Sequence, residues 1–501
     1  MASNGVDPET ANGEPYEVPE EIDFGSSDSE GMQERLEVIF DKQDVQRRRA
    51  SLAPQDRPSR PSKKRQKTEC FLHAMLEARM KEGQFSPNKA GVAAAHPTDK
   101  TPPELLEDQV VHRESRLLTK KQLSDMAAHV RNLSKKLSQV RLKLNVRNVF
   151  ILTKAHDKTL IAKTREMAEW LLQSKNPEGH PYTVWVEETM KHSSYFDAEG
   201  ITAKDPAYKD RLKYWTNELC KKRPHTFDLG VCLGGDGTVL YASWLFQRVP
   251  PPIMSFALGS LGFLTKFDFD KHADILNRAV KDGVTVSLRL RFEGTIMRSQ
   301  KREDEEQQNS RDLVEELIGD LATDATSHRP DGVHNIMNDI VLDRGPNATM
   351  SGIEMFGDEE HFTTVQGDGV CVATPTGSTA YNLAAGGSLC HPENPVMLVT
   401  AIAPHTLSFR PIILPDTTVL RLGVPYDARA SCWASFDGKE RSELKPGDYV
   451  TISTSRFPFP TVLPLERKGE DWVDSISRTL NWNNRQRQKA FDDQKKTASE
   501  G

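Results

Sequence analysis

The chain has 501 residues, of which 37% are hydrophobic and 28% are charged, and its formal net charge is −6. This length has room for two or three domains. The negative balance gives no reason to expect nucleic acid as a partner, and no apolar run approaches the length of a membrane span. The six cysteines lack paired spacing, which argues against a disulfide framework or a zinc site and fits a reduced, cytoplasmic setting.

Residues 1–105 have the composition of a disordered regulatory arm. Residues 1–30 contain nine acidic side chains and no lysine or arginine, whereas residues 42–67 contain ten basic and two acidic ones. The acidic start argues against a mitochondrial transit peptide. We interpret the basic block Lys63–Lys67 as a solvated linker, with a nuclear address as the alternative. Ser51 follows two arginines at the spacing that basophilic kinases prefer, so its phosphorylation is a hypothesis.

Residues 106–284 are expected to form an α/β domain with a parallel sheet. From Leu123 to Val140, apolar residues recur every three or four positions, which predicts a helix, and Thr119 with Gln122 offers a capping box at its start. Strands are predicted at 149–152, 182–186 and 228–233, with a second helix at 159–173. Alternating strands and helices are typical of a parallel sheet, which binds ligands at the carboxyl ends of its strands.

The segment Leu233–Thr238, with the sequence LGGDGT, follows a buried strand and precedes a helical run. Its glycines let backbone N–H groups approach an anionic ligand, and a helix N-terminus favours negative charge. Asp236 would repel phosphate unless it handles a proton or a metal ion, so the loop indicates phosphoryl transfer. The alternatives are an incidental aspartate in a glycine turn and an aspartate that only caps the helix. The spacing fits neither the Rossmann fingerprint nor the Walker A loop.

Residues 285–455 are expected to form a mainly β, sandwich-like domain. Residues 284–290 alternate with a period of two, and later apolar runs at 396–402, 418–422 and 449–453 are short and separated by turn residues. Residues 299–332 form a polar insertion, which we expect to be a solvated surface loop. In residues 456–501 a docking helix is expected before a frayed tail, with these apolar side chains: Trp472, Val473, Ile476, Leu480 and Trp482.

Four further segments share the glycine, asparagine, aspartate and threonine chemistry of the first loop. They are Gly259–Thr265, Asn338-Asp339, Gly367–Gly369 and Thr374–Tyr381. With these five motifs in order, the chain resembles the eukaryotic NAD kinase family from about Leu117 to Trp482, and Pro404–Pro411 is also similar to the eukaryotic form. The resemblance implies transfer of the ATP γ-phosphoryl group to the 2′-hydroxyl of the adenosine ribose of NAD, which makes NADP.

The resemblance also implies roles for single residues. Asp236 matches the general base, because a carboxylate that is ionised at neutral pH can accept the proton of the ribose hydroxyl. Mg²⁺ would accompany ATP, and no dedicated metal site in the protein is predicted. The implied ATP-binding residues are Gly234, Gly235, Gly237 and Thr238.

The implied NAD site uses both halves of the chain. Asn338 and Asp339 match the ribose-binding pair, whose second member is usually glutamate, so Asp339 has a shorter reach. Asp368 matches the residue that faces the nicotinamide half, and Tyr381 supplies an aromatic wall. The full set of implied NAD contacts is Asp236, Gly237, Phe263, Asn338, Asp339, Asp368, Thr379, Ala380, Tyr381, Asn382, Ala384, Ala403 and Asp437. No ligand role is predicted for His391 or His405, which are expected to pack in the core or on the surface.

Two other functions compete with this one. A lipid kinase of the diacylglycerol or sphingosine type shares the GGDGT segment, but residues 374–381 and the Asn338-Asp339 pair argue against it, and no membrane-facing amphipathic helix is evident. A regulatory nucleotide-binding protein would keep the fold without catalysis, which the intact Asp236 disfavours. The expected partners are NAD, ATP and further copies of the chain, because the family commonly forms dimers, tetramers or larger homo-oligomers.

Overall fold

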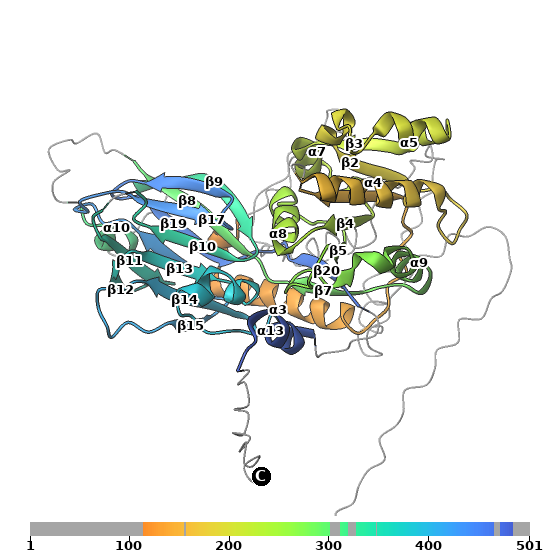
Figure 1. The fold of residues 1–501 in the computed structure, drawn as a ribbon. Helices are drawn as coiled ribbons and strands as arrows, with labels where there is room; N and C mark the ends of the chain where they lie inside the picture. Colours follow the sequence, from red (N-terminus) through yellow and green to blue (C-terminus); the bar gives the residue numbers. More distant parts are fainter. Residues whose placement is uncertain are drawn as a thin grey trace, which may run out of the picture. The chain divides into compact units, whose positions relative to one another are not determined.

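The computed structural model describes residues 114–154, 157–300, 311–318, 327–346, 348–464 and 471–483. The expectations for the N-terminal arm, for Ser51 and for Lys63–Lys67 lie outside the described residues. Three sheets organise the part of the chain that is described (Figure 1). None of the helices in these ranges has both the length and the apolar character needed to cross a bilayer.

The first sheet has eight strands and is mostly parallel. Its order is β3-β2-β1-β4-β5-β20-β7, and β6 pairs with β5. All of its neighbouring strands are parallel except β20 and β7. The strands are β1 (Asn148–Thr153), β2 (Thr183–Glu187), β3 (Leu212–Trp215), β4 (Leu229–Leu233), β5 (Ile253–Ala257), β6 (Phe267–Asp268), β7 (Thr285–Arg289) and β20 (Phe459–Leu463).

The helices of this part are α3 (Lys120–Leu137), α4 (Lys158–Gln173), α5 (Ala198–Lys204), α6 (Tyr208–Arg211), α7 (Asn217–Lys222), α8 (Asp236–Leu245) and α9 (His272–Asp282). The predicted capping box at the start of α3 is confirmed, since Thr119 and Gln122 bond each other's backbone. The apolar repeat buries Leu123, Leu133 and Leu137. Val140 is exposed beyond the end of α3, so the predicted last turn of this helix is wrong.

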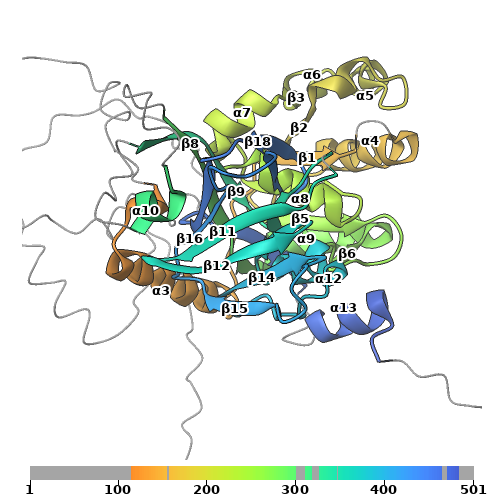
Figure 2. The same cartoon turned by 90° about the vertical axis from the view of Figure 1, so that its left-hand side faces the viewer.

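Two antiparallel six-stranded sheets form the second part, which confirms the sandwich-like expectation. Their orders are β15-β14-β13-β10-β17-β18 and β12-β11-β16-β19-β8-β9. Strands β11 and β12 contact β13 and β14 of the other sheet, so the two sheets face each other over one apolar core (Figure 2). The strands are β8 (Phe292–Ser299), β9 (His328–Ile336), β10 (Asp339–Asp343), β11 (Ser351–Gly357), β12 (Glu360–Gly367), β13 (Gly369–Ala373), β14 (Val396–Ile402), β15 (Ile412–Pro415), β16 (Leu420–Gly423), β17 (Cys432–Phe436), β18 (Glu440–Leu444) and β19 (Tyr449–Thr454).

The boundary between the two parts differs from the expected one at residue 285. β7 lies beyond that boundary but pairs with β20 in the first sheet, from Thr285↔Leu463 to Arg289↔Phe459. β20, which follows the whole β-rich part, also pairs with β5. An alternating strand pattern does not specify which sheet the strand joins, and this is why the predicted boundary is wrong. The β-rich part is inserted between β7 and β20.

The polar insertion at 299–332 is not a loop throughout. It contains α10 (Leu313–Ile318), and β9 begins at His328. Leu313 and Leu317 of α10 are buried in a small apolar cluster with Met297, Phe356 and Tyr449. The prediction of a surface loop is therefore wrong for these two segments. The sequence around α10 is mainly polar, and the two leucines that share one face of the helix do not stand out in it.

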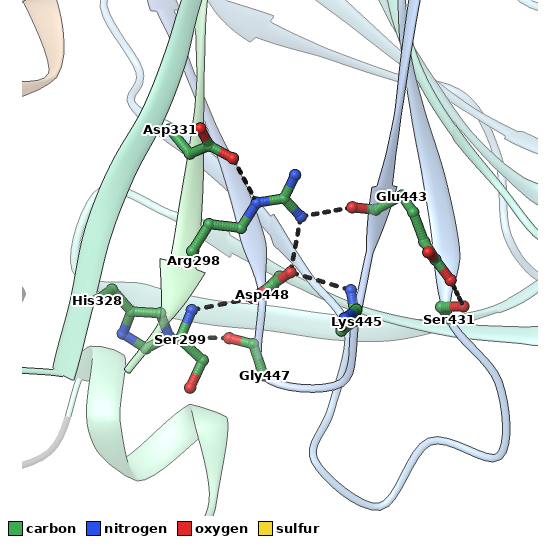
Figure 3. Close-up of polar contacts among 9 residues, drawn as sticks. All are labelled: Arg298, Ser299, His328, Asp331, Ser431, Glu443, Lys445, Gly447 and Asp448. Atoms are coloured by element: carbon green, nitrogen blue, oxygen red, sulfur yellow. Dashed lines mark hydrogen bonds and ion pairs between the residues drawn. The ribbon is translucent and has the colours of Figure 1, made fainter. Parts of the chain in front are cut away.

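A buried carboxylate holds one end of this insertion (Figure 3). Asp448 accepts the N–H of Ser299 at 2.9 Å, the N–H of Lys445 at 3.0 Å and the guanidinium of Arg298 at 2.9 Å. At the other end, His328 Nε2 lies 2.8 Å from the carbonyl oxygen of Gly447. Both ends of the insertion are therefore bound to the same turn, between β18 and β19.

The predicted final helix is α13 (Asp471–Leu480). Ile476 is buried, whereas Val473 and Trp482 are more than half exposed, so the helix docks through one narrow face. The ring of Trp472 lies edge-on to His391 at 5.2 Å between centroids. This contact agrees with the packing role expected for His391.

Candidate functional site

The glycine loop lies between the carboxyl end of β4 and the start of α8. The N–H of Gly234 donates to the carbonyl of Phe256 on β5 at 3.0 Å, so it is already bonded within the sheet. A Cβ atom added at Gly235 or Gly237 would meet nothing within 4 Å. The first N–H groups of a helix have no partner within it, and here the two open glycines leave them accessible to an anion.

The carboxylate of Asp236 is held by the neighbouring loop, Gly259–Thr265. Its Oδ2 accepts the N–H of Phe263 at 2.9 Å. Its Oδ1 accepts the N–H of Leu264 at 3.0 Å, the N–H of Thr265 at 3.1 Å and the hydroxyl of Thr265 at 3.2 Å. The carboxylate therefore binds this loop and does not cap α8, so the helix-capping alternative is wrong.

The close approach of this loop to Asp236 requires a glycine at position 262. A Cβ atom there would lie 2.2 Å from Asp236 Oδ1. The N–H of Gly262 also donates to the hydroxyl of Thr265 at 2.9 Å, which closes the turn. The loop is thus folded around the carboxylate, and it also places Phe263 beside it.

The Asn338-Asp339 pair lies at the start of β10, in backbone contact with the Thr374–Tyr381 segment. The N–H of Thr374 donates to the carbonyl of Asn338 at 2.8 Å. A Cβ atom at Gly377 would lie 2.1 Å from that same oxygen, so only glycine permits this packing. The structure therefore brings together two motifs that are separated by more than thirty residues in the sequence.

Asp339 is buried, with 7% of its surface exposed. Burial and the neighbouring charge of Asp437 raise the pKa of Asp339 to about 7, while a hydrogen bond from the backbone N–H of Tyr381 opposes this effect. A buried carboxylate beside a second one resists ionisation, because both desolvation and like charge disfavour the anion. The protonation state of Asp339 therefore changes near neutral pH.

Tyr381 and Asp368 lie in the same region. Burial raises the pKa of Tyr381, and the carboxylates of Asp343, Asp339 and Asp368 act in the same direction, which shows that these groups are neighbours. Tyr381 is 44% exposed, so part of this residue is accessible to a ligand. The guanidinium of Arg344 lies 2.9 Å from the carboxylate of Asp368.

The turn Thr376–Thr379 and α12 (Tyr381–Ala384) contain the remaining residues of this motif. Asn382 is fully buried, and its amide donates to the carbonyls of Ser378 at 3.3 Å and Ser388 at 3.1 Å and accepts the hydroxyl of Thr400 at 2.8 Å. Asn382 thus holds the turn together. Thr379 and Ala380 are partly buried and Ala384 is exposed. Their contacts with NAD stay predictions.

Ala403 and Asp437 share a left-handed backbone, with φ of 44° and 49°. The side chain of Asp437 is directed at the backbone of the Asn338-Asp339 turn. Its carboxylate accepts the N–H groups of Met337 at 2.8 Å, Asn338 at 2.7 Å and Asp339 at 3.1 Å. The contact that the structure shows for Asp437 is therefore with the turn itself, and direct contact with NAD stays a prediction.

Sequence reasoning missed Arg291, which lies between β7 and β8 and is fully buried. Its guanidinium donates to the carbonyls of Ser243 at 3.2 Å and Phe246 at 2.8 Å, at the end of α8. The one signal in the sequence is an arginine between apolar neighbours, Leu290 and Phe292. Within the described ranges, no group of three or more His, Cys, Asp and Glu residues is placed to hold a metal ion.

The chain is similar to known proteins along most of the part that the structure describes. Models of the ATP-NAD kinase N-terminal and C-terminal domains match residues 149–284 and 337–463. The NAD(+) kinase of Saccharomyces cerevisiae is 42% identical over 370 residues, which cover 74% of this chain and 66% of that relative. The ATP-NADH kinase YEF1 of the same organism is 41% identical over 367 residues, which cover 73% and 70%.

A solved structure is also similar. Yeast NADH kinase complexed with NADH matches with a TM-score of 0.54 and 29% identity, over 69% of this chain and 90% of that one. An uncharacterized kinase of Schizosaccharomyces pombe, C3H5.11, is 42% identical over 375 residues, which cover 75% of this chain and 89% of that relative. The family models and these relatives together show that the chain belongs to the ATP-NAD kinase family.

Proposed function

We propose that this member of the ATP-NAD kinase family transfers the γ-phosphoryl group of ATP to the 2′-hydroxyl of the adenosine ribose of NAD, with Asp236 as the general base. Membership of the family supports the reaction. The main structural support for the residue is its position, because the Asp236 carboxylate lies at the start of α8 beside the open glycines Gly235 and Gly237.

In this reaction the oxygen of the ribose hydroxyl forms a bond to the γ-phosphorus, the bond from that phosphorus to the bridging oxygen breaks, and ADP leaves. The hydroxyl proton passes to Asp236. That carboxylate accepts four hydrogen bonds from the Gly259–Thr265 loop, about as many as its lone pairs allow. At least one of these bonds must give way to the ribose hydroxyl, so we expect the loop to move when NAD binds.

The phosphates of ATP would bind at the start of α8. The N–H groups of Gly235 and Gly237 and the helix dipole favour an anion there. Gly234 would shape the loop instead of donating, since its N–H is bonded to Phe256, and Thr238 would complete the cradle. Mg²⁺ would enter with ATP and neutralise its oxygens, because this ion commonly binds substrate phosphates and few protein carboxylates.

NAD would bind across the Asn338-Asp339 turn and the exposed Tyr381. Ionised Asp339 would accept a ribose hydroxyl, and Asp368 with its partner Arg344 would face the nicotinamide half. The other residues proposed to contact NAD are Gly237, Phe263, Thr379, Ala380, Ala384 and Ala403, whereas Asn382 is fully buried and Asp437 binds the Asn338-Asp339 turn.

The test is an assay on purified protein with NAD, ATP and Mg²⁺, coupled to an NADP-specific dehydrogenase. We expect a signal that requires all three components, and replacing NAD by NADH measures the preference between them. Binding of NAD without turnover would replace the proposal by a regulatory nucleotide-binding protein. Neither binding nor turnover would point to lipid hydroxyls as acceptors.

We also propose that the chain acts as a homo-oligomer in the cytoplasm. β15 lies at the edge of its sheet, where Ile413 is 55% exposed, and the nearby Leu407 is 85% exposed. Apolar side chains at an open sheet edge favour association. The described cysteines are all free, which suits a reducing compartment. Light scattering of the purified chain measures the number of subunits, and a fluorescent fusion in cells shows the compartment.

A further inference from the structure

Two sets of polar contacts bind the end of α8, and the first of them reaches the segment that leads into the Asn338-Asp339 turn. The first is a reciprocal pair between Gln247, which follows α8, and Asn335, at the end of β9. The N–H of Asn335 donates to Gln247 Oε1 at 2.7 Å, and its side-chain amide donates to the Gln247 carbonyl at 2.9 Å. Gln247 Nε2 returns a bond to the Asn335 carbonyl at 3.2 Å.

The second set is made by Arg291. Its Nη1 donates to the carbonyls of Ser243 and Phe246, and its Nη2 donates to the carbonyl of Arg248 at 2.6 Å. The last carbonyls of a helix lack partners and favour a cation, so this arginine caps the end of α8. Its Nε donates to the carbonyl of Phe457 at 2.5 Å, where the chain returns from the sandwich to the first sheet.

The charge of the same guanidinium acts on Asp437. Burial raises the pKa of Asp437, and the three N–H groups of residues 337–339 together with the charge of Arg291 oppose that effect. The N–H of Asp437 also donates to the carbonyl of Asp339 at 3.0 Å, so side chain and backbone both bind the turn. Aspartate is one of the few residues that tolerate its left-handed backbone.

We propose that Arg291 and Asp437 are positioning residues. Arg291 holds the end of α8, Asp437 holds the Asn338-Asp339 turn, and the pair of Gln247 and Asn335 joins the two, so that the ribose hydroxyl meets Asp236 at the other end of that helix. The inference rests on the proposed function. Because α8 is a rigid element, a shift of the turn relative to the helix becomes a shift of the acceptor relative to the base. A misplacement of about 1 Å can cost about 100-fold in rate.

The surroundings of Asp339 give this proposal a readout in the pH profile. Asp339 is faced by Asp437 from the end of β17, by Cys371 on β13 and by the N–H of Tyr381. Of these groups, Asp437 raises the pKa of Asp339, after burial itself. Replacing Asp437 by asparagine removes that charge, so the acid limb of kcat/KM for NAD should move to lower pH.

The experiment compares Asp437→Asn with Asp448→Asn. Asp448 is a buried carboxylate that, like Asp437, accepts backbone N–H groups. It also binds Arg298, and it holds the insertion and not the proposed NAD site (Figure 3). We expect similar losses of thermal stability. Only Asp437→Asn should raise KM for NAD, by about tenfold, with KM for ATP unchanged and with the shifted acid limb.

A KM for NAD and an acid limb like those of the wild type in Asp437→Asn would overturn the proposal, because a merely structural carboxylate changes only the folded fraction. If that variant does not fold, Arg291→Lys is the second test. It keeps the positive charge but lacks the planar guanidinium whose N–H groups bind several carbonyls at once. An unchanged KM for NAD in Arg291→Lys would then overturn the proposal. If the proposed function itself fails, the wild type lacks turnover, which distinguishes that failure from failure of the positioning role. Calorimetry of NAD binding then still compares the variants with the wild type.

Discussion

Two aspartates at this site are surrounded in opposite ways. Asp236 accepts four hydrogen bonds from one glycine-containing loop, all of which stabilise a negative charge. Asp339 is buried beside the carboxylate of Asp437, and its pKa is raised to about 7. The same residue type is therefore bound by four donors of one loop in the first region, whereas in the second it is buried beside another carboxylate and changes charge near neutrality. In the proposed function Asp236 is the base and Asp339 is the ribose ligand, and the different surroundings of the two carboxylates suit these two roles.

The largest expected effect separates the two aspartates directly. Asp236→Asn should lower kcat by about 1,000-fold, because general-base catalysis is lost, and should leave NAD binding and the melting temperature close to the wild type. Turnover and calorimetry on the same preparation measure both quantities. Substantial retained activity would mean that the base is another group.

The loop around Asp236 gives the next largest effect. Gly262→Ala places a methyl group 2.2 Å from Asp236 Oδ1, so the loop or the carboxylate must move, and kcat should fall by about 100-fold. Gly352→Ala on β11 is the control, since a Cβ atom there meets nothing within 4 Å. Equal activity of the two variants would show that the loop geometry does not matter for catalysis.

Asp339 should determine the pH dependence. In the wild type, kcat/KM for NAD should fall as the pH drops through about 7, since protonation removes the charged acceptor of the ribose hydroxyl. Asp339→Asn should lack this limb and raise KM for NAD by about tenfold. An acid limb that persists in the variant would assign it to a different group.

The raised pKa of Asp339 also affects the free energy of unfolding. The pKa of Asp339 is higher in the folded chain than its unfolded value of about 3.9, so the folded state binds the proton more tightly and loses stability as the pH rises between the two values. Asp339→Asn removes that loss. Its melting temperature relative to the wild type should therefore rise from pH 4 to pH 7, and a constant difference would contradict the raised pKa.

The smallest effect concerns one bond on Asp236. Thr265→Val removes the hydroxyl that donates to Asp236 and accepts from Gly262, and kcat should change by less than about tenfold. Thr265→Ser, which keeps the hydroxyl, should restore the wild-type value. A loss as large as that of Asp236→Asn would show that the hydroxyl has a role of its own.

Local patterns predicted much of this molecule. The capping box of α3, strand β14 and the glycine loop each depend on residues within a few positions of one another, and the sequence shows those directly. The five ordered motifs also predicted that Asp339 and Tyr381 belong to one site. Their contact depends on a backbone approach at Gly377, which a glycine in a motif indicates without showing what it approaches.

The contacts that hold the site together were not predictable. Arg291 donates to backbone carbonyls more than forty residues away. Every residue has a backbone carbonyl, so no sequence pattern indicates which ones an arginine binds. The side chain of Asp437 points at the Asn338-Asp339 turn because the backbone of Asp437 is left-handed. The sequence of its own turn is equally compatible with a side chain that points to solvent. Strand β7 was assigned to the wrong domain because its partner β20 lies at the far end of the chain.

The insertion of the sandwich between β7 and β20 has a consequence for synthesis of the chain. Ser287 and Thr461, which bond across these two strands, are 174 residues apart. A ribosome therefore releases β5 and β7 long before the strand that fills the gap between them, and their edges stay open while the whole sandwich is made. We expect nascent chains that stop before β20 to aggregate or recruit chaperones, because unpaired strand edges form hydrogen bonds with strands of other chains.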